Sequence, residues 1–234
     1  MYDVYGDVVV LTERSNCQLR DVLAIGYKKI YRRTAYKSQY RVLDLEWVSP
    51  YVEKSFSSKY IHTEDGHHYY GDLKQVYFSA RYATQRRQLK KYFSQKDLKS
   101  LIVVGAGIGP FTVVLSPFFE CISQYETNPL CERYNRINMY YNKCPAQYFS
   151  IPYKGEIADA LVSVIPKGSL QFQLSFNFRS ICVLYFLADD SECQNVADVF
   201  RTHYGCKVDH KVVRAYSKGC NIYRYTLSRQ SPNK

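Results

Sequence analysis

The second half of the chain alternates between short apolar runs and longer amphipathic segments, a pattern that predicts alternating strands and helices. The apolar runs of strand length are 101–104, 121–125, 160–165, 181–187 and 221–227. The helices predicted between them are 111–118, 129–142 and 189–204, of which the second begins at Pro129. Alternating elements with apolar strands indicate an α/β fold, with a mostly parallel sheet covered on both faces.

The first hundred residues have shorter strand-like runs and more Tyr, Lys and Arg. Residues 8–10 and 40–48 are expected to form strands, and residues 60–70 a hairpin that turns at Asp65-Gly66. A strongly basic helix is expected over residues 82–99. We therefore predict a small α+β domain over residues 1–80, a connecting basic helix over 81–100, and a larger α/β domain over 101–234.

Composition points to a globular protein with a polyanionic partner. The chain has 234 residues, of which 46% are apolar and 23% charged, so it can bury a core and is not disordered. Lys and Arg number 32 against 21 Asp and Glu, which leaves a net charge of +11. This surplus favours nucleic acid over an anionic membrane as the partner. The 24 Tyr and 12 Phe supply rings that can stack on bases or fill an ordinary core.

Cysteine spacing argues against a metal site and against disulfides. The eight cysteines are scattered, no pair has the CxxC spacing of a zinc site, and His67-His68 has no third ligand at a sensible spacing. The sequence has no apparent secretion signal and no apolar stretch near 18 residues. We expect buried free thiols in a reducing compartment, the cytoplasm or alternatively the mitochondrion or nucleus.

A glycine-rich segment, Gly105-Ala106-Gly107-Ile108-Gly109-Pro110, follows the first apolar strand. A dinucleotide-binding loop requires glycine at position 110, whereas this G-x-G-x-G-P order is more typical of sites for S-adenosylmethionine (SAM). Glu126 follows Gly105 by 21 positions and ends the next predicted strand, where a carboxylate can accept both ribose hydroxyls. The pattern predicts a nucleotide-type ligand, and an incidental glycine-rich turn is the alternative.

Two further stretches of the chain are specific enough to compare with known families, I-H-T-E-D-G at 61–66 and K-Q-V-Y-F-S-A-R-Y-A-T-Q-R at 74–86. They resemble the tRNA (guanine-37 N1)-methyltransferases of archaea and eukaryotes, which typically read H-x-E-N-G and K-V-Y-F-(S/N)-P-R-L-(A/S)-T-E-R at these places. The resemblance runs from about residue 2 to 228 and includes 107–111, 126–129 and 159–166. It implies a Rossmann-like class I methyltransferase with SAM as cofactor and tRNA as substrate. We also expect a monomer, and no membrane partner because no apolar stretch is long enough to span a bilayer.

The resemblance also implies roles for individual residues. Arg41 would face O6 of the target guanine, Tyr77 would position the base, and Gln85 occupies the place of the family's general base. The residues implied to bind the cofactor are Gly105, Gly107, Gly109, Phe111, Glu126 and Asn128. The RNA contacts are expected from Arg81, Arg86, Arg87, Lys90 and Lys91, joined by Lys28, Lys29, Arg32 and Arg33.

Departures from the family pattern leave other functions open. Gln85 replaces a glutamate, Val164 replaces an asparagine, and the family's N-terminal domain for the tRNA elbow is not expected. The acids that could replace the general base are Glu46, Glu64 and Asp65. One alternative is aminocarboxypropyl transfer from SAM to a wyosine-type base at position 37, and another is a weakened relative that only binds tRNA. A small-molecule methyltransferase is disfavoured by the net charge.

Overall fold

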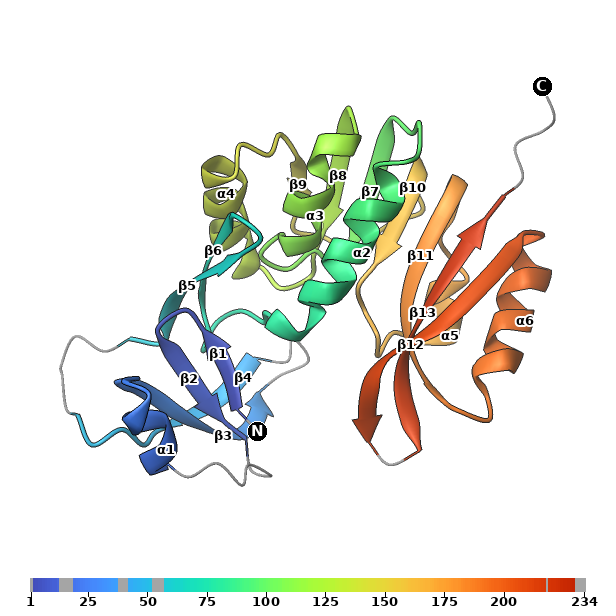
Figure 1. The fold of residues 1–234 in the computed structure, drawn as a ribbon. Coiled ribbons are helices and arrows are strands. Elements are labelled where there is room, and N and C mark those ends of the chain that lie inside the picture. The colour runs from blue at the N-terminus through green and yellow to red at the C-terminus, as the bar shows by residue number, and fades with distance from the viewer. Residues whose placement is uncertain (1, 13–18, 38–41, 52–56, 218, 230–234) are drawn as a thin grey trace. The chain divides into compact units, whose positions relative to one another are not determined.

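The computed structural model describes residues 2–12, 19–37, 42–51, 57–217 and 219–229 (Figure 1). The chain divides into two compact units that alternate along the sequence. The first unit contains residues 1–88, 107–114 and 127–144, and the second contains 89–106, 115–126 and 145–234. The predicted domains, with boundaries at residues 80 and 100, are consecutive in sequence, whereas these two units are not. The predicted domain boundaries stay a prediction.

The second unit is built on a seven-stranded sheet with the order β12-β13-β11-β10-β7-β8-β9. Its strands are β7 (Ser100–Val104), β8 (Cys121–Tyr125), β9 (Gln147–Phe149), β10 (Ile157–Ser163), β11 (Asn177–Asp189), β12 (Lys207–Ser217) and β13 (Cys220–Ser228). The five strands from β7 to β11 are parallel, and the last two are antiparallel. The predicted α/β fold with a mostly parallel sheet is therefore confirmed.

One apolar core lies on a face of this sheet. It contains Leu161, Cys182 and Leu184 from the central strands and Tyr225 from β13. The helix α6 (Cys193–Tyr204) closes it with Phe200, whose ring centre lies 5.3 Å from that of Tyr225. The short helices of this region are η2 (Ser116–Phe118) and α5 (Leu170–Gln173).

Most predicted elements are present, with shifted ends. The basic helix is α2 (Ala83–Phe93), and it ends six residues before the predicted residue 99. Residues 94–97 are all exposed, so no apolar side chain holds a further turn against the core. Strands β9 and β12 have no counterpart in the prediction, because both lie at sheet edges and carry mixed polar residues. No helix among the described residues is long and apolar enough to cross a membrane.

The first unit begins with a small sheet in the order β1-β2-β3-β4. Its elements are β1 (Tyr2–Tyr5), β2 (Val8–Leu11), α1 (Leu19–Ala24), β3 (Lys29–Lys37) and β4 (Val42–Trp47). Strands β2 and β3 are parallel and are connected through α1, whose Val22 packs on Val9 and Ile30. The predicted hairpin is β5 (Lys59–Glu64) and β6 (His67–Asp72), and its turn residues Asp65 and Gly66 both have positive φ.

The remaining elements of the first unit are η1 (Ala80–Tyr82), α3 (Pro110–Leu115) and α4 (Cys131–Tyr141). Helix α4 holds β6 through amide side chains. Asn138 accepts from the Tyr70 N–H at 2.7 Å and donates to the Tyr70 carbonyl at 3.1 Å. Asn142, one turn later, forms the same pair of bonds with His68 at 3.1 and 2.8 Å. These amides therefore bond to β6 as a third strand would bond to the two-stranded hairpin.

Replacing Asn138 by Leu should destabilise the protein strongly. The change leaves the partly buried N–H and carbonyl of Tyr70 and the buried carbonyl of Ile108 without their Asn138 partner, and each unsatisfied buried group costs about 1–3 kcal/mol. We expect the free energy of unfolding, measured by urea denaturation, to fall by roughly 3 kcal/mol. Asn195→Leu on the exposed face of α6 is the control and should change it little. Equal stability of the Asn138 variant and wild type would contradict this role.

Candidate functional site

The glycine loop begins at the end of β7 and is bonded to the end of β8. The N–H groups of Gly105 and Ala106 both donate to the carbonyl of Tyr125, at 2.8 and 3.2 Å. Gly105 has a φ of +73°, and a Cβ there would lie 2.5 Å from Cγ1 of Ile165. Only glycine fits this position. The loop therefore starts beside the residue that precedes Glu126.

Glu126 is half-buried and continues from β8 at the same sheet edge. Its N–H donates to the carbonyl of Phe149 at 3.1 Å, which fixes its backbone. In open α/β sheets, ligands bind beyond the carboxyl ends of the strands. Gly105 and Glu126 are thus brought together at the edge where a nucleotide-type ligand is expected.

The later residues of the loop lie in the first unit and are bonded to α4. Gly107 and Gly109 have φ of +56° and +90°. Asn135 donates its amide N–H to the Gly107 carbonyl at 3.1 Å, and Asn138 donates to the Ile108 carbonyl at 2.9 Å. The loop conformation is therefore fixed by side chains of the protein itself.

Two predicted cofactor residues are engaged within the protein. Asn128 is buried, donates to the Gln75 carbonyl at 3.2 Å and accepts from the Leu130 N–H at 3.1 Å. Phe111 is also buried, with the Arg86 guanidinium 5.5 Å from its ring centre. Both side chains serve the packing of the first unit, and this geometry does not favour a cofactor contact for either.

Arg86 forms a buried ion pair with Glu64. Its Nε and one terminal nitrogen donate to the two carboxylate oxygens at 2.6 and 2.5 Å, in the bidentate geometry of strong pairs. Both terminal nitrogens also approach the Ser79 carbonyl, and the guanidinium lies over the rings of Phe78 and Phe111. The Arg86 side chain is only 1% exposed. The predicted phosphate contact of Arg86 is therefore wrong, and Glu64 is not available as a general base.

The predicted catalytic residues are placed as follows. Gln85 is buried on α2, next to Arg86 in sequence. The Tyr77 carbonyl passes beside the glycine loop, since a Cβ on Gly107 would lie 3.7 Å from it. Arg41 lies outside the described residues. Tyr77 and the loop are thus neighbours within the first unit.

His62 lies near the ion pair, with its Nε2 3.9 Å from a Glu64 oxygen and its ring 5.1 Å from that of Phe78. Burial lowers the pKa of His62, and although Glu64 acts in the opposite direction, the net shift is downward. The imidazole is therefore neutral near pH 7. The other two candidate acids are at the surface: Asp65 lies 3.6 Å from Arg87 in the hairpin turn, and Glu46 is exposed on β4.

The remaining predicted RNA contacts are at the surface. Arg81 and Lys29 bond to Asp3 and Asp7 at 2.7 and 2.6 Å, so part of their charge is compensated. Lys90 and Lys91 are exposed in the last turn of α2, and no described acid forms an ion pair with either. These two lysines are therefore exposed cations of α2, and their contact with RNA stays a prediction.

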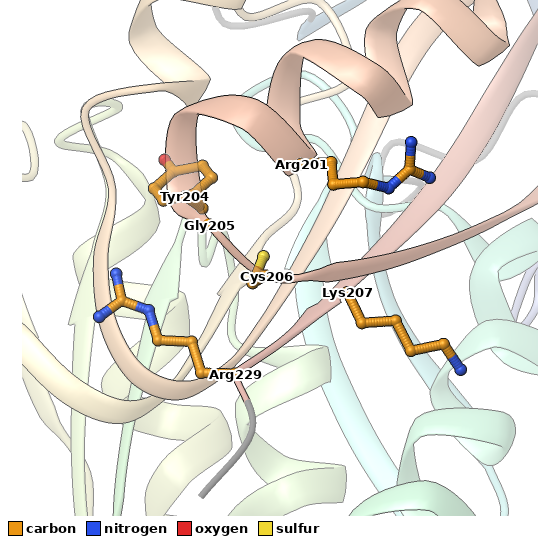
Figure 2. Close-up of a pocket in the computed structure, with 6 residues that line it drawn as sticks. All are labelled: Arg201, Tyr204, Gly205, Cys206, Lys207 and Arg229. Atoms are coloured by element: carbon orange, nitrogen blue, oxygen red, sulfur yellow. The ribbon is translucent and has the colours of Figure 1, made fainter. Parts of the chain in front are cut away.

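A hollow of about 710 Å³ lies at the C-terminal end of α6, next to the start of β12 and the end of β13. It is lined by Arg201, Tyr204, Gly205, Cys206, Lys207 and Arg229. Figure 2 shows that its three cationic side chains extend in different directions. Burial raises the pKa of the Cys206 thiol, which disfavours a reactive thiolate. This hollow has no counterpart in the sequence predictions and brings no catalytic pair together.

The sequence prediction missed the amides of α4. Asn135, Asn138 and Asn142 are spaced by three and four residues, which places them on one helix face. This face is also where buried positions such as Tyr134 and Met139 lie. Asparagines repeated among buried helix positions must find hydrogen-bond partners, so the spacing is the signal that reveals them.

Removing one partner of the buried ion pair should be costly. Glu64→Gln leaves the Arg86 guanidinium without its compensating charge, and breaking a buried pair typically costs about 3–5 kcal/mol. We expect the unfolding free energy to fall by roughly that amount in a denaturant titration. Glu132→Gln removes an exposed pair with Arg136 on α4 and should have little effect. A similar small loss for both variants would show that the buried pair is not a structural requirement.

Residues 60–159 match the family model of the TRM5/TYW2 methyltransferase domain. Two relatives, both tRNA (guanine(37)-N(1))-methyltransferase Trm5b, come from Methanocaldococcus jannaschii and Pyrococcus abyssi. Both are 30% identical to this chain, the first over 121 residues and the second over 115. In both cases the match covers 48% of this chain and 34% of the relative. In sequence, the match thus spans about a third of the length of these relatives.

Solved structures share the fold over nearly the whole chain. Trm5b from Pyrococcus abyssi superposes with a TM-score of 0.78 at 19% identity, over 97% of this chain and 74% of that protein. The complex of aTrm5 with tRNALeu gives 0.78 at 21% identity, over 98% and 72%. TYW2 from P. horikoshii with MeSAdo gives 0.71 at 17% identity, over 97% and 90%. The predicted Rossmann-like fold with a small N-terminal domain is confirmed by these structures, and residues 60–159 are the part of the chain that is similar to the TRM5/TYW2 methyltransferase domain in sequence.

Proposed function

We propose that the chain is a SAM-dependent methyltransferase that acts on N1 of the guanine at position 37 of tRNA. The observation that carries the proposal is the sheet edge where Gly105, Ala106 and Glu126 meet, within a sequence that matches the methyltransferase family model. Relatives that match over about half of this chain are named for this reaction. The net charge of +11 suits a tRNA substrate.

The residues at the sheet edge fit an adenosyl ligand. The glycine backbone at 105 lacks a Cβ, and the Glu126 carboxylate can accept hydrogen bonds from two ribose hydroxyls. Gly107 and Gly109 remain predicted cofactor residues on their sequence pattern. When bound, SAM supplies an electrophilic methyl group on its sulfonium, and the chain's own residues have to hold the guanine and manage its N1 proton.

Gln85 is the residue that limits this chemistry. Attack by N1 requires loss of its proton to a base within hydrogen-bond reach. A neutral amide can hold the guanine by hydrogen bonds but accepts a proton only with great difficulty. Arg41 is proposed to balance the charge that develops on O6. We therefore expect the wild-type chain to methylate guanine slowly.

Aminocarboxypropyl transfer is the second candidate function. Gln85 and Val164 stand where the methyltransferases have glutamate and asparagine, and a TYW2 structure superposes on 97% of this chain. Both reactions use SAM and a base at position 37, and the mass of the product distinguishes them. A tRNA-binding protein without activity would give neither product. We further propose that the chain acts as a monomer in the cytoplasm, where its seven described cysteines, all free, stay reduced.

Glu126→Gln should weaken SAM binding. The amide keeps the shape of the side chain and loses the charge, and hydrogen bonds to charged groups contribute about 1.5–3 kcal/mol. Calorimetric titration should show affinity for SAM reduced by roughly tenfold to a hundredfold. Glu120→Gln, at an exposed position before β8, should bind as wild type does. Unchanged affinity of the Glu126 variant would place the cofactor elsewhere.

Gln85→Glu should accelerate methyl transfer. The substitution is nearly isosteric and supplies a carboxylate, and general-base catalysis typically contributes about 10²- to 10⁴-fold. We expect the rate of N1 methylation at guanine 37, measured by mass spectrometry of unmodified tRNA incubated with SAM, to rise at least about tenfold. The gain should grow with pH until the glutamate is ionised.

Gln88→Glu, on the same helix, adds the same charge and should not change the rate. A heavier adduct on a wyosine-type base, with no gain in N1 methylation, would favour aminocarboxypropyl transfer. No transfer by wild type or variant, on tRNA that the protein binds, would overturn the proposed methylation.

A further inference from the structure

A lysine and a tyrosine meet at the carboxyl edge of the seven-stranded sheet. The Lys167 ammonium lies over the ring of Tyr216, 5.0 Å from its centre. Lys167 follows β10, and Tyr216 is near the end of β12. Strand β12 is antiparallel to β13, and β13 is antiparallel to β11, so β12 runs in the same direction as the five parallel strands (Figure 1). Both residues therefore lie at the same sheet edge as Gly105 and Glu126.

A turn after β10 fixes the backbone of Lys167. The Gly168 N–H donates to the Ile165 carbonyl at 3.0 Å, which closes a β-turn with Lys167 near its tip. The Pro166 carbonyl accepts from the Leu187 N–H at 2.9 Å, so the turn is also bonded to β11. The position from which the lysine side chain extends is therefore set by the sheet.

The same turn begins beside the glycine loop. A Cβ on Gly105 would lie 2.5 Å from Cγ1 of Ile165, so these two residues are neighbours. From β7, which precedes Gly105, the sheet continues through β10, β11 and β13 to β12. At about 5 Å between strands, Tyr216 lies on the order of 20 Å from Gly105 along the edge. A ligand that reaches from the cofactor site to Tyr216 must therefore be extended, as a polynucleotide strand is.

The pair is open to a ligand. Lys167 is exposed, and no carboxylate among the described residues forms an ion pair with it. Tyr216 is 37% exposed. Exposed cation–π contacts are weak, so a nucleobase can take the place of the ammonium on the ring. The released ammonium can then bind a phosphate of the same strand.

Methylation at N1 of guanine gives such a contact a use. N1 lies on the Watson–Crick edge of the base, and enzymes that act on a base take it out of its stack. The neighbouring nucleotide then loses a stacking partner. An aromatic side chain can replace that partner, because every base has a π face. A tyrosine beside a lysine offers the two contacts that hold single-stranded RNA, a ring for the base and a cation for the phosphate.

We propose that Lys167 and Tyr216 form a nucleotide clamp for an unpaired nucleotide of the RNA substrate, which stacks its base on Tyr216 and places a phosphate against Lys167. The identity of the RNA rests on the proposed function, whereas the clamp rests on the pair at the sheet edge. Because stacking accepts any base, the clamp contributes affinity and orientation and selects single-stranded RNA rather than a sequence.

The test is binding of an unmodified tRNA transcript without SAM, followed by fluorescence anisotropy over a series of salt concentrations. Tyr216→Ala should weaken binding by roughly 5- to 100-fold, the loss typical of one stacked base, and leave the salt dependence unchanged. Lys167→Gln should make the slope of log K against log salt shallower by about 0.7, the contribution of one phosphate contact to a single strand. Tyr216→Phe keeps the ring and should bind nearly as wild type does.

Two controls isolate the clamp. Lys96→Gln removes the same charge from a similar contact, since the Lys96 ammonium is 5.2 Å from the centre of the Tyr92 ring. Lys96 precedes β7 and thus lies at the amino edge of the sheet, so this variant should bind tRNA nearly as wild type does. The second control is a fully paired RNA duplex, whose bases are stacked on one another. Wild type and Tyr216→Ala should bind the duplex equally.

Thermal unfolding separates the clamp from a structural role of the pair. Tyr216→Ala and Lys167→Gln both remove the cation–π contact, which contributes little at the surface, so both should unfold within a few degrees of wild type. A pair with only a structural role would lower both midpoints and leave tRNA affinity unchanged. If Tyr216→Ala folds poorly, Tyr216→Leu provides the second test, because it keeps apolar volume and loses the aromatic ring.

Wild-type tRNA affinity in a folded Tyr216→Ala variant would overturn the clamp, as would an equal loss on the duplex, an equal loss in Lys96→Gln or an unchanged salt slope in Lys167→Gln. Normal methylation with unchanged affinity in Tyr216→Ala would refute the clamp and leave the proposed function intact. Weaker tRNA binding by this variant of a chain that transfers no methyl group would refute the function and support the clamp.

Discussion

The amide side chains of α4 are the constraint on which the first unit depends. A two-stranded hairpin is marginally stable by itself, and β6 would expose backbone groups along its outer edge. Asn138 and Asn142 satisfy those groups, while Asn135 and Asn138 bond to the carbonyls of Gly107 and Ile108. One helix therefore fixes both the hairpin of the most specific family motif and the last part of the glycine loop. A substitution of these α4 asparagines should therefore affect both the hairpin and the glycine loop.

The buried ion pair distinguishes two neighbouring residues of the motif, Gln85 and Arg86. Arg86 is bonded to Glu64 and enclosed by aromatic rings, so it stabilises the hairpin on α2. Gln85 is its neighbour in sequence and is also buried, but it takes no part in the bidentate pair between Arg86 and Glu64. The ion pair that holds the hairpin on α2 therefore does not require the glutamate that the family resemblance implies at position 85.

Periodicity was sufficient to predict the α/β fold because the central strands are apolar and buried on both faces. It failed at β9 and β12, where an edge position admits mixed polar residues such as Lys211 and removes the apolar signal. Similarly, the uniform positive charge of residues 82–99 indicated a solvated helix, whereas Arg86 is buried. The charge pattern around Arg86 does not reveal that its ion-pair partner, Glu64, lies 22 positions away in the sequence. The fold of the hairpin places Glu64 beside Arg86. The glycine loop and Glu126 could be predicted because strand ends meet at one edge of a parallel sheet.

The basic segment over residues 82–99 places its cations at different depths in the fold. The guanidinium of Arg86 is buried and compensated by the Glu64 carboxylate, so it is a structural group whatever its place in a basic segment. Lys99, in the same segment, is exposed and pairs with Glu120 at the surface, where an ion pair contributes little to stability. The depth at which the fold places a cation therefore decides what its ion pair contributes, and the sequence alone does not show that depth.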